Sequence, residues 1–349
     1  MADQVPAPAS GTPAPLRLHA LAYSLGVTAA VTAAARLGLA DAVGEEPVRP
    51  AELAAAVGAD EEALVQLLRA LVCHGVFREA EEGGYAHTEL SRLLRTDAPA
   101  SRKAMALLAG APFAWRIWSR LDDAVRTGES VFPGLYGKPL FAHLHEDEPE
   151  LGALFDRAMA KSGETSAVAV AAALDLAGTD TVADIGGGHG TLLRALLERH
   201  PALNGVLFDL EQVVAHADPV LREGGELAGR CRLVSGDCHI EVPVTADVYL
   251  LKGVVHMWND ATAVAALRTL VREARPGARV VLVEQVLDAT DNPEIATVMN
   301  LLMLVSQGGR ERTAREFRTL LERAGLEFRS ITATGSVVRL IEAVVPGAR

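Results

Sequence analysis

The stretch Val182-Ala183-Asp184-Ile185-Gly186-Gly187-Gly188-His189-Gly190 decides the fold of this chain. A short apolar run leads directly into a loop in which four of five residues are glycine, and a helical pattern begins near Thr191. Glycines at such a point allow a tight turn and let a ligand approach the backbone closely. The pattern is typical of the first strand, loop and helix of a nucleotide-binding α/β sheet.

The C-terminal half repeats this alternation of strand and helix. Apolar runs predict strands at residues 182–185, 205–208, 231–234, 248–251 and 279–283, with helices at 192–199, 213–221 and 261–274 between them. Such alternation predicts an α/β fold with a doubly wound, mainly parallel sheet. We expect the apolar runs of residues 331–345 to add edge strands.

The N-terminal part has a different, mostly helical pattern. Helical spacing at residues 50–58 and 60–74 is followed by a short strand at 76–78, an acidic turn at 79–84 and a strand at 85–88, which is a winged-helix outline. The second helix opens with Asp60, Glu61 and Glu62, which would repel phosphates. A dimerisation or scaffold role is therefore favoured over DNA binding.

Length, charge and cysteine content limit the class of protein. The chain has 349 residues, so two domains are expected. Its net charge of −12 argues against nucleic acid and against an anionic membrane surface as partners. Three scattered cysteines, Cys73, Cys231 and Cys238, suggest neither a disulfide framework nor a zinc site, and we expect a reduced, cytoplasmic setting.

The same patterns predict four segments. Residues 1–15 form a disordered tail without signal-peptide character, and 16–100 form the winged-helix-like domain. Residues 101–175 are a helical linker and substrate wall, interrupted by turns at 127–139, and 176–349 form the cofactor-binding domain. The alanine-rich residues 20–43 are interpreted as a buried or subunit-contact helix pair rather than a membrane span.

A second motif, Leu251-Lys252-Gly253-Val254-Val255-His256-Met257-Trp258-Asn259-Asp260, follows a predicted strand. Ligands of open α/β sheets bind at the carboxyl ends of the strands. A histidine there can serve as a general base, because its unperturbed pKa lies near neutral pH. The motif predicts an enzyme that moves a proton.

The glycine loop favours an adenosyl cofactor without phosphate. As a dinucleotide fingerprint it lacks the third glycine, which weakens an NAD dehydrogenase as an alternative. Asp209 and Asp237 end the next two strands, where carboxylates can accept hydrogen bonds from ribose and adenine. These acids favour S-adenosylmethionine over NAD. The alternative that the glycines form only a packing turn stays open.

Several motifs in order carry a resemblance to a known family. They are Trp118-Ser119-Arg120-Leu121, Phe155-Asp156-Arg157-Ala158-Met159, the glycine loop, the His256 motif, Val283-Glu284 and Gly308-Gly309-Arg310-Glu311-Arg312-Thr313. With them the chain resembles the S-adenosylmethionine-dependent small-molecule O-methyltransferases of the caffeate type, especially the antibiotic-tailoring branch that includes anthracycline and mitomycin enzymes. The resemblance implies a class I methyltransferase (Rossmann-like) fold and a homodimer formed through the N-terminal domain.

The resemblance also implies residue roles. His256 matches the general base, and Glu284 and Glu311 match the carboxylates that flank and orient it. The implied cofactor contacts are Asp184, Gly186, Gly188, Asp209, Leu210, Asp237, Cys238 and Lys252. The implied substrate contacts are Phe155, Met159, Trp258, Met303 and Gln307. The chain departs from many relatives at Met257, where they have Asp, at Cys238, where they have Met or Phe, and at Ser306-Gln307, where plant members have Asn-Pro.

The expected reaction is methyl transfer to a hydroxyl of an aromatic or quinone metabolite, with S-adenosylhomocysteine as product. A phenol has a pKa near 10, so a base helps to generate the phenolate. Glu311 follows a double glycine, which suggests a loop that could swing over the site. No His/Asp/Glu cluster shows metal-ligand spacing, so no metal is expected.

Four further alternatives stay open. His256 could be structural, and Glu311 could pair with Arg310 or Arg312 in a solvated cluster. The fold could serve another reaction, including N- or C-methylation. The chain could also be a non-catalytic winged-helix regulator.

Overall fold

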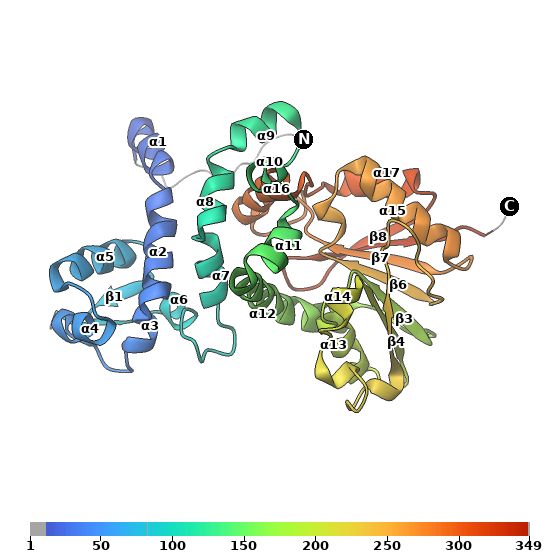
Figure 1. The fold of residues 1–349 in the computed structure, drawn as a ribbon, viewed down its shortest axis with the longest axis horizontal. Helices are drawn as coiled ribbons and strands as arrows, with labels where there is room; N and C mark the ends of the chain where they lie inside the picture. Colours follow the sequence, from blue (N-terminus) through green and yellow to red (C-terminus); the bar gives the residue numbers. More distant parts are fainter. Residues whose placement is uncertain (1–11, 82, 348–349) are drawn as a thin grey trace. The chain divides into compact units, whose positions relative to one another are not determined.

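The computed structural model describes residues 12–81 and 83–347, which form two compact units (Figure 1). Unit 1 comprises the described part of Met1–Trp115 together with Ala153–Ala158. Unit 2 comprises Arg116–Gly152 and the described part of Met159–Arg349. The predicted four-segment division concerns function, and it stays a prediction.

Unit 1 is built from short helices and one hairpin. Its elements are α1 (Ala14–Ala22), α2 (Leu25–Leu37), α3 (Leu39–Ala42), α4 (Pro50–Val57), α5 (Glu61–Cys73), β1 (Phe77–Glu79), β2 (Tyr85–His87), α6 (Glu89–Arg92), α7 (Lys103–Ala109) and the start of α8 (Pro112–Trp118). The side chain of Asp60 caps α5 by accepting a hydrogen bond from the Ala63 N–H at 2.9 Å. The predicted winged-helix outline is confirmed.

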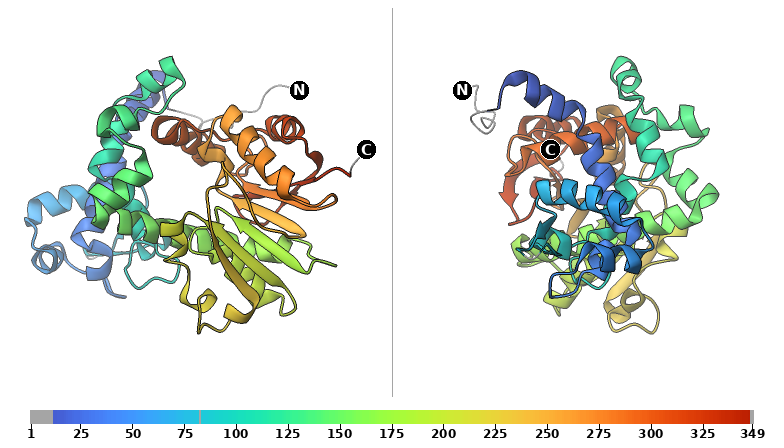
Figure 2. Two further views of the ribbon diagram at one scale, coloured as in Figure 1. Left: turned by 45° about the vertical axis from the view of Figure 1, so that its right-hand side comes forward. Right: turned by 90° about the vertical axis from the view of Figure 1, so that its left-hand side faces the viewer.

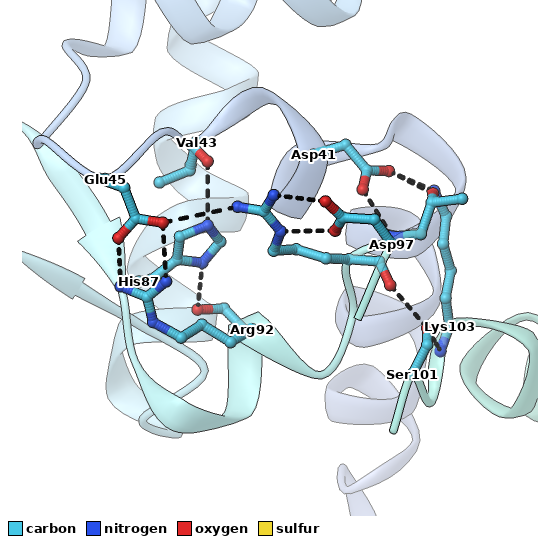
Figure 3. A network of polar contacts seen from close by, with 11 residues as sticks. Asp41, Val43, Glu45, His87, Arg92, Asp97, Ser101 and Lys103 are labelled. Atoms are coloured by element: carbon cyan, nitrogen blue, oxygen red, sulfur yellow. Dashed lines mark hydrogen bonds and ion pairs between the residues drawn. The ribbon is translucent and has the colours of Figure 1, made fainter. Parts of the chain in front are cut away.

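Polar contacts hold the end of α3 to the hairpin and to α7 (Figure 3). The buried ring of His87 lies with Nε2 3.0 Å from the Val43 carbonyl oxygen. Burial lowers the pKa of His87, so the ring is neutral at pH 7. The ammonium of Lys103 lies 2.6 Å from Asp41 Oδ2. These contacts fix the hairpin against the helices of unit 1.

One expectation for the N-terminus needs correction. The helix α1 begins at Ala14, so residues 14 and 15 are not part of a tail; Pro15 suits the first turn of a helix, which needs no N–H donor there. Residues 1–11 of the predicted tail lie outside the described residues. The alanine-rich region forms α2 and α3, which are separated at Gly38 with φ +70°.

The helix α1 buries none of its residues, and α2 buries only Thr32, Ala34 and Ala35. No single helix within the described ranges is long and apolar enough to cross a membrane. The pair α1 and α2, bent by 43°, meets the length and composition test when joined.

Unit 2 begins with helices and continues into a seven-stranded sheet. The first elements are the rest of α8, then α9 (Leu121–Thr127), α10 (Phe132–Tyr136), α11 (Leu140–Ala142), the π-helix η1 (His143–Asp147) and α12 (Pro149–Ala173), whose residues 153–158 belong to unit 1. The strands are β3 (Thr181–Ile185), β4 (Asn204–Asp209), β5 (Cys231–Ser235), β6 (Val248–Lys252), β7 (Arg279–Glu284), β8 (Glu327–Ala333) and β9 (Arg339–Val344). Their order is β5-β4-β3-β6-β7-β9-β8.

Strands β3 to β7 are parallel, whereas β9 pairs antiparallel with both β7 and β8. The predicted class I methyltransferase-type α/β sheet is therefore confirmed. The expectation of edge strands at residues 331–345 is half right. Of the two strands in this region, β8 is an edge strand, whereas β9 lies inside the sheet between β7 and β8.

Helices cover both faces of the sheet (Figure 2). Alternate strand residues pack against α15 (Asp260–Glu273) and α17 (Ala314–Arg323) on one face. The others pack against α12 and α13 (Thr191–Arg199) on the opposite face. In β6, for example, Tyr249 and Leu251 belong to the first core and Val248 and Leu250 to the second. This two-residue alternation is what a doubly covered sheet requires.

One predicted helix is wrong. Residues 213–221 do not form a continuous helix but contain the end of α14 (Glu211–Val214) and the 3₁₀ turn η2 (Pro219–Leu221). Proline at 219 disfavours helical backbone in the preceding residue, and Asp218 is extended with ψ 130°. The remaining elements are η3 (Ala228–Arg230), η4 (Val255–Met257) and α16 (Pro293–Gln307).

Candidate active site

The carboxyl ends of the parallel strands bring the predicted residues to one edge of the sheet. Asp184 lies near the end of β3, Asp209 ends β4, and Asp237 follows β5. Lys252 ends β6 and Glu284 ends β7. Because parallel strands point the same way, their carboxyl ends lie along one edge of the sheet, and these side chains share that edge.

The glycine loop after β3 has backbone geometry and packing that side chains would disturb. Gly186 and Gly188 have φ +67° and +59°. A Cβ on Gly187 would stand 2.5 Å from Leu207 Cδ1 and 2.7 Å from Asp184 Cγ, whereas a Cβ on Gly188 would meet nothing within 4 Å. The loop is thus packed tightly on the protein side, and at Gly188 it faces open space.

Asp209 presents a half-buried carboxylate beside this loop. The N–H of Gly188 donates to Oδ2 at 2.8 Å, and the N–H of Leu210 donates to Oδ1 at 2.7 Å. Burial is the largest influence and raises the pKa of Asp209, while the two N–H donors oppose it. The side chain of Leu210 is 43% exposed. The carboxylate is therefore fixed in direction and keeps acceptor capacity for a ligand hydroxyl.

The loop after β5 contains Asp237, Cys238 and His239. The Asp237 carboxylate accepts a hydrogen bond from the His239 N–H at 2.9 Å. Burial raises the pKa of the Cys238 thiol to about 11, and the side chain packs against one of the two sheet cores. The His239 ring meets Trp258 edge-on, with centroids 4.5 Å apart. This contact joins the ends of β5 and β6.

Asp184 is buried, and the half-buried Lys252 interacts with it electrostatically. Asp184 is 1% exposed, and neither of its carboxylate oxygens accepts a hydrogen bond of ordinary geometry from the described residues. Burial raises the pKa of Asp184 to about 7, with Lys252 opposing that rise. Burial likewise lowers the pKa of Lys252, which Asp184 and Glu284 oppose. An unsatisfied buried carboxyl of this kind is frequent at functional sites.

His256 lies in η4, just beyond β6, and two glutamates face the same ring nitrogen. Its Nδ1 is 2.8 Å from Glu311 Oε1 and 3.8 Å from Glu284 Oε2. Burial is the largest single influence and would lower the pKa of His256, but Glu284 and Glu311 together raise it to about 9. Within the described ranges Nε2 has no hydrogen-bond partner. The ring is thus oriented by carboxylates on one side and open on the other.

Glu284 does more than face the histidine. It is 1% exposed, and its Oε1 accepts hydrogen bonds from the N–H groups of Val254 and Val255 at 3.1 and 2.8 Å. Burial raises the pKa of Glu284, and the charge of His256 opposes this. Glu284 therefore fixes the backbone that leads into η4 as well as the charge near the ring.

Glu311 does not pair with its neighbouring arginines. It is 1% exposed, so it is not part of a solvated cluster. Arg310 pairs with Glu316, and Arg312 is buried and pairs with Asp260.

The double glycine before Glu311 has a packing role that the sequence did not reveal. Gly308 ends α16 with φ +73°. A Cβ on Gly309 would stand 2.2 Å from the His256 carbonyl oxygen. The absence of a Cβ at Gly309 therefore allows close packing against η4, and a loop that swings over the site stays a prediction.

The predicted substrate residues lie on three elements. Met159 is 40% exposed on α12, and Phe155 lies on the same helix in the part that belongs to unit 1. Met303 and Gln307 share one face of α16, four residues apart, and are half-buried. Trp258 directly follows η4 and packs against the sheet core that α15 and α17 cover. Their role in substrate binding stays a prediction.

Sequence reasoning missed Arg312 and Asn300. Asn300 of α16 accepts a hydrogen bond from the Glu311 N–H at 2.9 Å. Arg312 is 0% exposed, the largest fully buried side chain among the described residues. Its position next to Glu311 in the quoted motif was the only available signal.

Two sets of potential metal ligands occur within the described ranges. His256, Glu284 and Glu311 present ligand atoms within 4.8 Å of one another, and so do Asp237, Cys238 and His239. Sequence spacing could not reveal the first set, because its members lie on three separate segments. The expectation that no metal is bound stays a prediction.

Comparison with known proteins agrees with this geometry. The family model for the O-methyltransferase domain matches residues 118–327, and that for the O-methyltransferase dimerisation domain matches residues 20–97. The mitomycin biosynthesis 6-O-methyltransferase of Streptomyces lavendulae is 39% identical over 90% of this chain and 89% of its own length. The phenazine-1-carboxylate N-methyltransferase of Pseudomonas aeruginosa is 34% identical over 90% of this chain and 92% of its own length.

A solved structure gives the same result for the fold. It is an O-methyltransferase from neocarzinostatin biosynthesis in complex with S-adenosyl-L-homocysteine and 1,4-dihydroxy-2-naphthoic acid. It is 34% identical, with a TM-score of 0.78 over 94% of this chain and 98% of that chain.

Proposed function

Since this chain belongs to the S-adenosylmethionine-dependent O-methyltransferases, we propose that it methylates a hydroxyl of a small aromatic or quinone metabolite, with His256 as the general base. The observation that carries the proposal is the asymmetric environment of the His256 ring. Nδ1 is held by Glu311, and Nε2 has no partner in the described part of the chain. A base oriented in this way can accept a proton from a bound hydroxyl.

The residues at the sheet edge fit the cofactor. The bare backbone at Gly188 allows close approach, whereas the absence of a Cβ at Gly186 makes room for Val254, and Gly186 is proposed as a backbone contact. The fixed carboxylate of Asp209 can accept hydrogen bonds from ribose hydroxyls, and Asp237 offers a further acceptor. Asp184, Leu210, Cys238 and Lys252 complete the proposed cofactor contacts. When bound, S-adenosylmethionine supplies a methyl group on a positively charged sulfur.

The proton chemistry follows from charges around His256. Two buried carboxylates stabilise the imidazolium, so the ring holds a proton strongly once it accepts one. Removal of the hydroxyl proton by Nε2 leaves an oxygen with the electron density needed to form the new bond to carbon. Methyl transfer then depends mainly on the alignment of the reactants.

The substrate class rests on the relatives and on the predicted lining. Relatives of this chain include a mitomycin biosynthesis 6-O-methyltransferase and a 2,7-dihydroxy-5-methyl-1-naphthoate 7-O-methyltransferase. We propose a mitomycin-like or polyketide-type antibiotic intermediate as the substrate of this chain. Phe155, Met159, Trp258, Met303 and Gln307 are the proposed substrate contacts. Apolar and aromatic side chains suit a flat ring, and Gln307 adds a polar group.

We also propose a cytoplasmic homodimer formed through unit 1, with no nucleic-acid or membrane partner. A hollow of about 500 Å³ on unit 1 is lined mainly by α2 and includes Leu25, Arg36 and Trp115. Large apolar side chains of α1 and of the junction between α1 and α2 are also exposed, and Leu21 is 71% exposed. Such a surface suits a second copy of the chain. We also propose that residues 16–100 serve dimerisation, 101–175 form a substrate wall and 176–349 bind the cofactor. The family models for dimerisation at 20–97 and for methyl transfer at 118–327 support this division.

The test combines cofactor binding with turnover. We expect S-adenosylhomocysteine, and not NAD, to bind in calorimetric titration, both to wild type and to His256→Ala. With 1,4-dihydroxy-2-naphthoic acid and related phenols as probes, His256→Ala should reduce turnover about 10²–10⁴-fold. The matched control is His216→Ala, because His216 is exposed and, among the described residues, its ring hydrogen-bonds only to the Gln212 carbonyl.

The outcomes separate the alternatives. Full turnover in His256→Ala would overturn the base assignment. Methylation of an amine or carbon in place of oxygen would point to the N- or C-methyl alternative. Failure to bind S-adenosylhomocysteine, combined with a salt-sensitive DNA gel shift, would favour the regulator.

A further inference from the structure

Arg312 is fully buried although it carries a charge, and its guanidinium donates hydrogen bonds to residues 255–260, around His256, and to the nearby Arg310. Nη1 donates to the carbonyl oxygens of Val255 at 3.0 Å and Arg310 at 3.2 Å. Nη2 donates to the Trp258 carbonyl oxygen at 2.8 Å, and Nε donates to Asp260 Oδ1 at 2.9 Å. One guanidinium therefore holds the η4 segment on both sides of His256.

The backbone around Arg312 is also hydrogen-bonded to the segment that contains His256. The Arg310 N–H donates to the His256 carbonyl oxygen at 2.8 Å, and the absence of a Cβ at Gly309 permits that close approach. The Arg312 carbonyl accepts a hydrogen bond from the Leu287 N–H at 3.0 Å, three residues beyond Glu284. Arg312, which directly follows Glu311, thus connects the segments beyond the ends of β6 and β7.

Only arginine can make this set of contacts. Its planar group offers five N–H donors in a fixed arrangement, whereas the lysine ammonium offers three from a single atom. A buried charge usually costs as much in desolvation as its partner returns, so its presence here is better explained by geometry than by stability. The geometry it fixes is the backbone from which the His256 side chain projects.

We propose that Arg312 is a positioning residue for methyl transfer: its guanidinium holds the backbone on both sides of His256 so that the ring stays on Glu311 and presents Nε2 to the substrate. The proposal rests on the proposed role of His256. Arg312 has a second effect, because its positive charge opposes the two carboxylates and lowers the pKa of His256. Its loss should therefore alter both the placement and the basicity of the ring.

The test uses Arg312→Lys and Arg312→Gln in the full-length protein. We expect kcat with a weakly acidic phenol to fall about 10–100-fold in both, because small misplacements of a catalytic group cost that much. Affinity for S-adenosylhomocysteine should stay within about twofold, since no Arg312 contact involves the glycine loop or Asp209. In Arg312→Gln the pH at which activity reaches half its maximum should rise, whereas Arg312→Lys should keep it near the wild-type value.

Arg230→Lys is the matched control for a merely structural role. Arg230 also donates to three backbone carbonyls, those of Leu197, His200 and Leu203, but it lies near the amino ends of the strands. We expect Arg230→Lys to lower the melting temperature about as much as Arg312→Lys and to leave kcat and the pH profile unchanged. A spectrum of ¹⁵N-labelled histidine should show a shifted His256 Nδ1–H signal in the Arg312 variants only.

The results separate this proposal from the proposed function. If His256→Ala retains turnover, the function of His256 is wrong and the Arg312 proposal falls with it. If His256→Ala loses turnover while Arg312→Lys and Arg312→Gln keep wild-type kcat, pH profile and His256 signal, only the Arg312 proposal is overturned.

Discussion

His256 Nδ1 and Glu311 Oε1 lie 2.8 Å apart although 55 residues separate them in the chain. The carboxylate fixes which ring nitrogen faces the protein and leaves Nε2 for another group. Because Glu284 Oε2 also lies 3.8 Å from Nδ1, the negative charge is concentrated on one side of the ring. This arrangement determines both the direction and the protonation of the proposed base.

Glu311→Gln should keep a hydrogen bond to His256 and remove one of the charges that raise its pKa. We expect the pKa of His256 to fall below about 9, and kcat with a weakly acidic phenol to fall about 10–100-fold. The midpoint of the pH–rate profile should move to lower pH. Steady-state kinetics between pH 6 and 10 measure both effects. Glu322→Gln on the exposed face of α17 is the control, and equal losses in both variants would contradict the role of Glu311.

The wild-type pH profile should depend on the acidity of the substrate hydroxyl. The pKa of His256 is raised to about 9, so the unprotonated base is scarce at pH 7 and becomes abundant as pH rises through 9. A weakly acidic phenol should therefore react faster up to about pH 9. A strongly acidic hydroxyl arrives as an anion and should react well at pH 7. A profile that levels off near pH 6.5 with the weak phenol would contradict the raised pKa.

Gly309→Ala should displace the segment that contains His256. The added Cβ would lie 2.2 Å from the His256 carbonyl oxygen and 2.4 Å from the Met257 carbonyl carbon, so the backbone must move. We expect about 1–3 kcal/mol of destabilisation and a drop in kcat of about 10²-fold. Gly229→Ala is the control, since its Cβ would meet nothing within 4 Å. Unchanged kcat in Gly309→Ala, measured with the same phenol, would refute the predicted coupling.

The three cysteines should differ in reactivity. Burial raises the pKa of Cys231 and Cys238 to about 11, whereas Cys73 is exposed. The thiolate is the reactive form, so at pH 8 a disulfide reagent such as Ellman's should titrate one thiol rapidly in the folded protein and three after unfolding. Cys73→Ser should abolish the rapid phase. A rapid phase that persists in Cys73→Ser would show that a buried thiol is accessible.

Local patterns predicted most of the fold and much of the site. The glycine loop, the alternation of apolar strands with helices, and Asp209, Asp237 and Glu284 at strand ends all reflect short-range rules. One failure was also local in origin. The helix expected at residues 213–221 was interrupted because Pro219 disfavours helical backbone at Asp218.

The sequence by itself determined that Asp184, Asp209, Lys252 and Glu284 lie near one edge of the sheet. Parallel strands have their carboxyl ends at the same edge, and the alternation of side chains along each strand sets the face to which each one points. Only the tertiary structure decided that Glu311 and Glu284 meet the same nitrogen of His256, and that Arg312 is buried beneath that segment. These contacts join residues 28 to 57 positions apart. Such contacts follow from how separate elements pack together, and no periodic pattern within a single element encodes them.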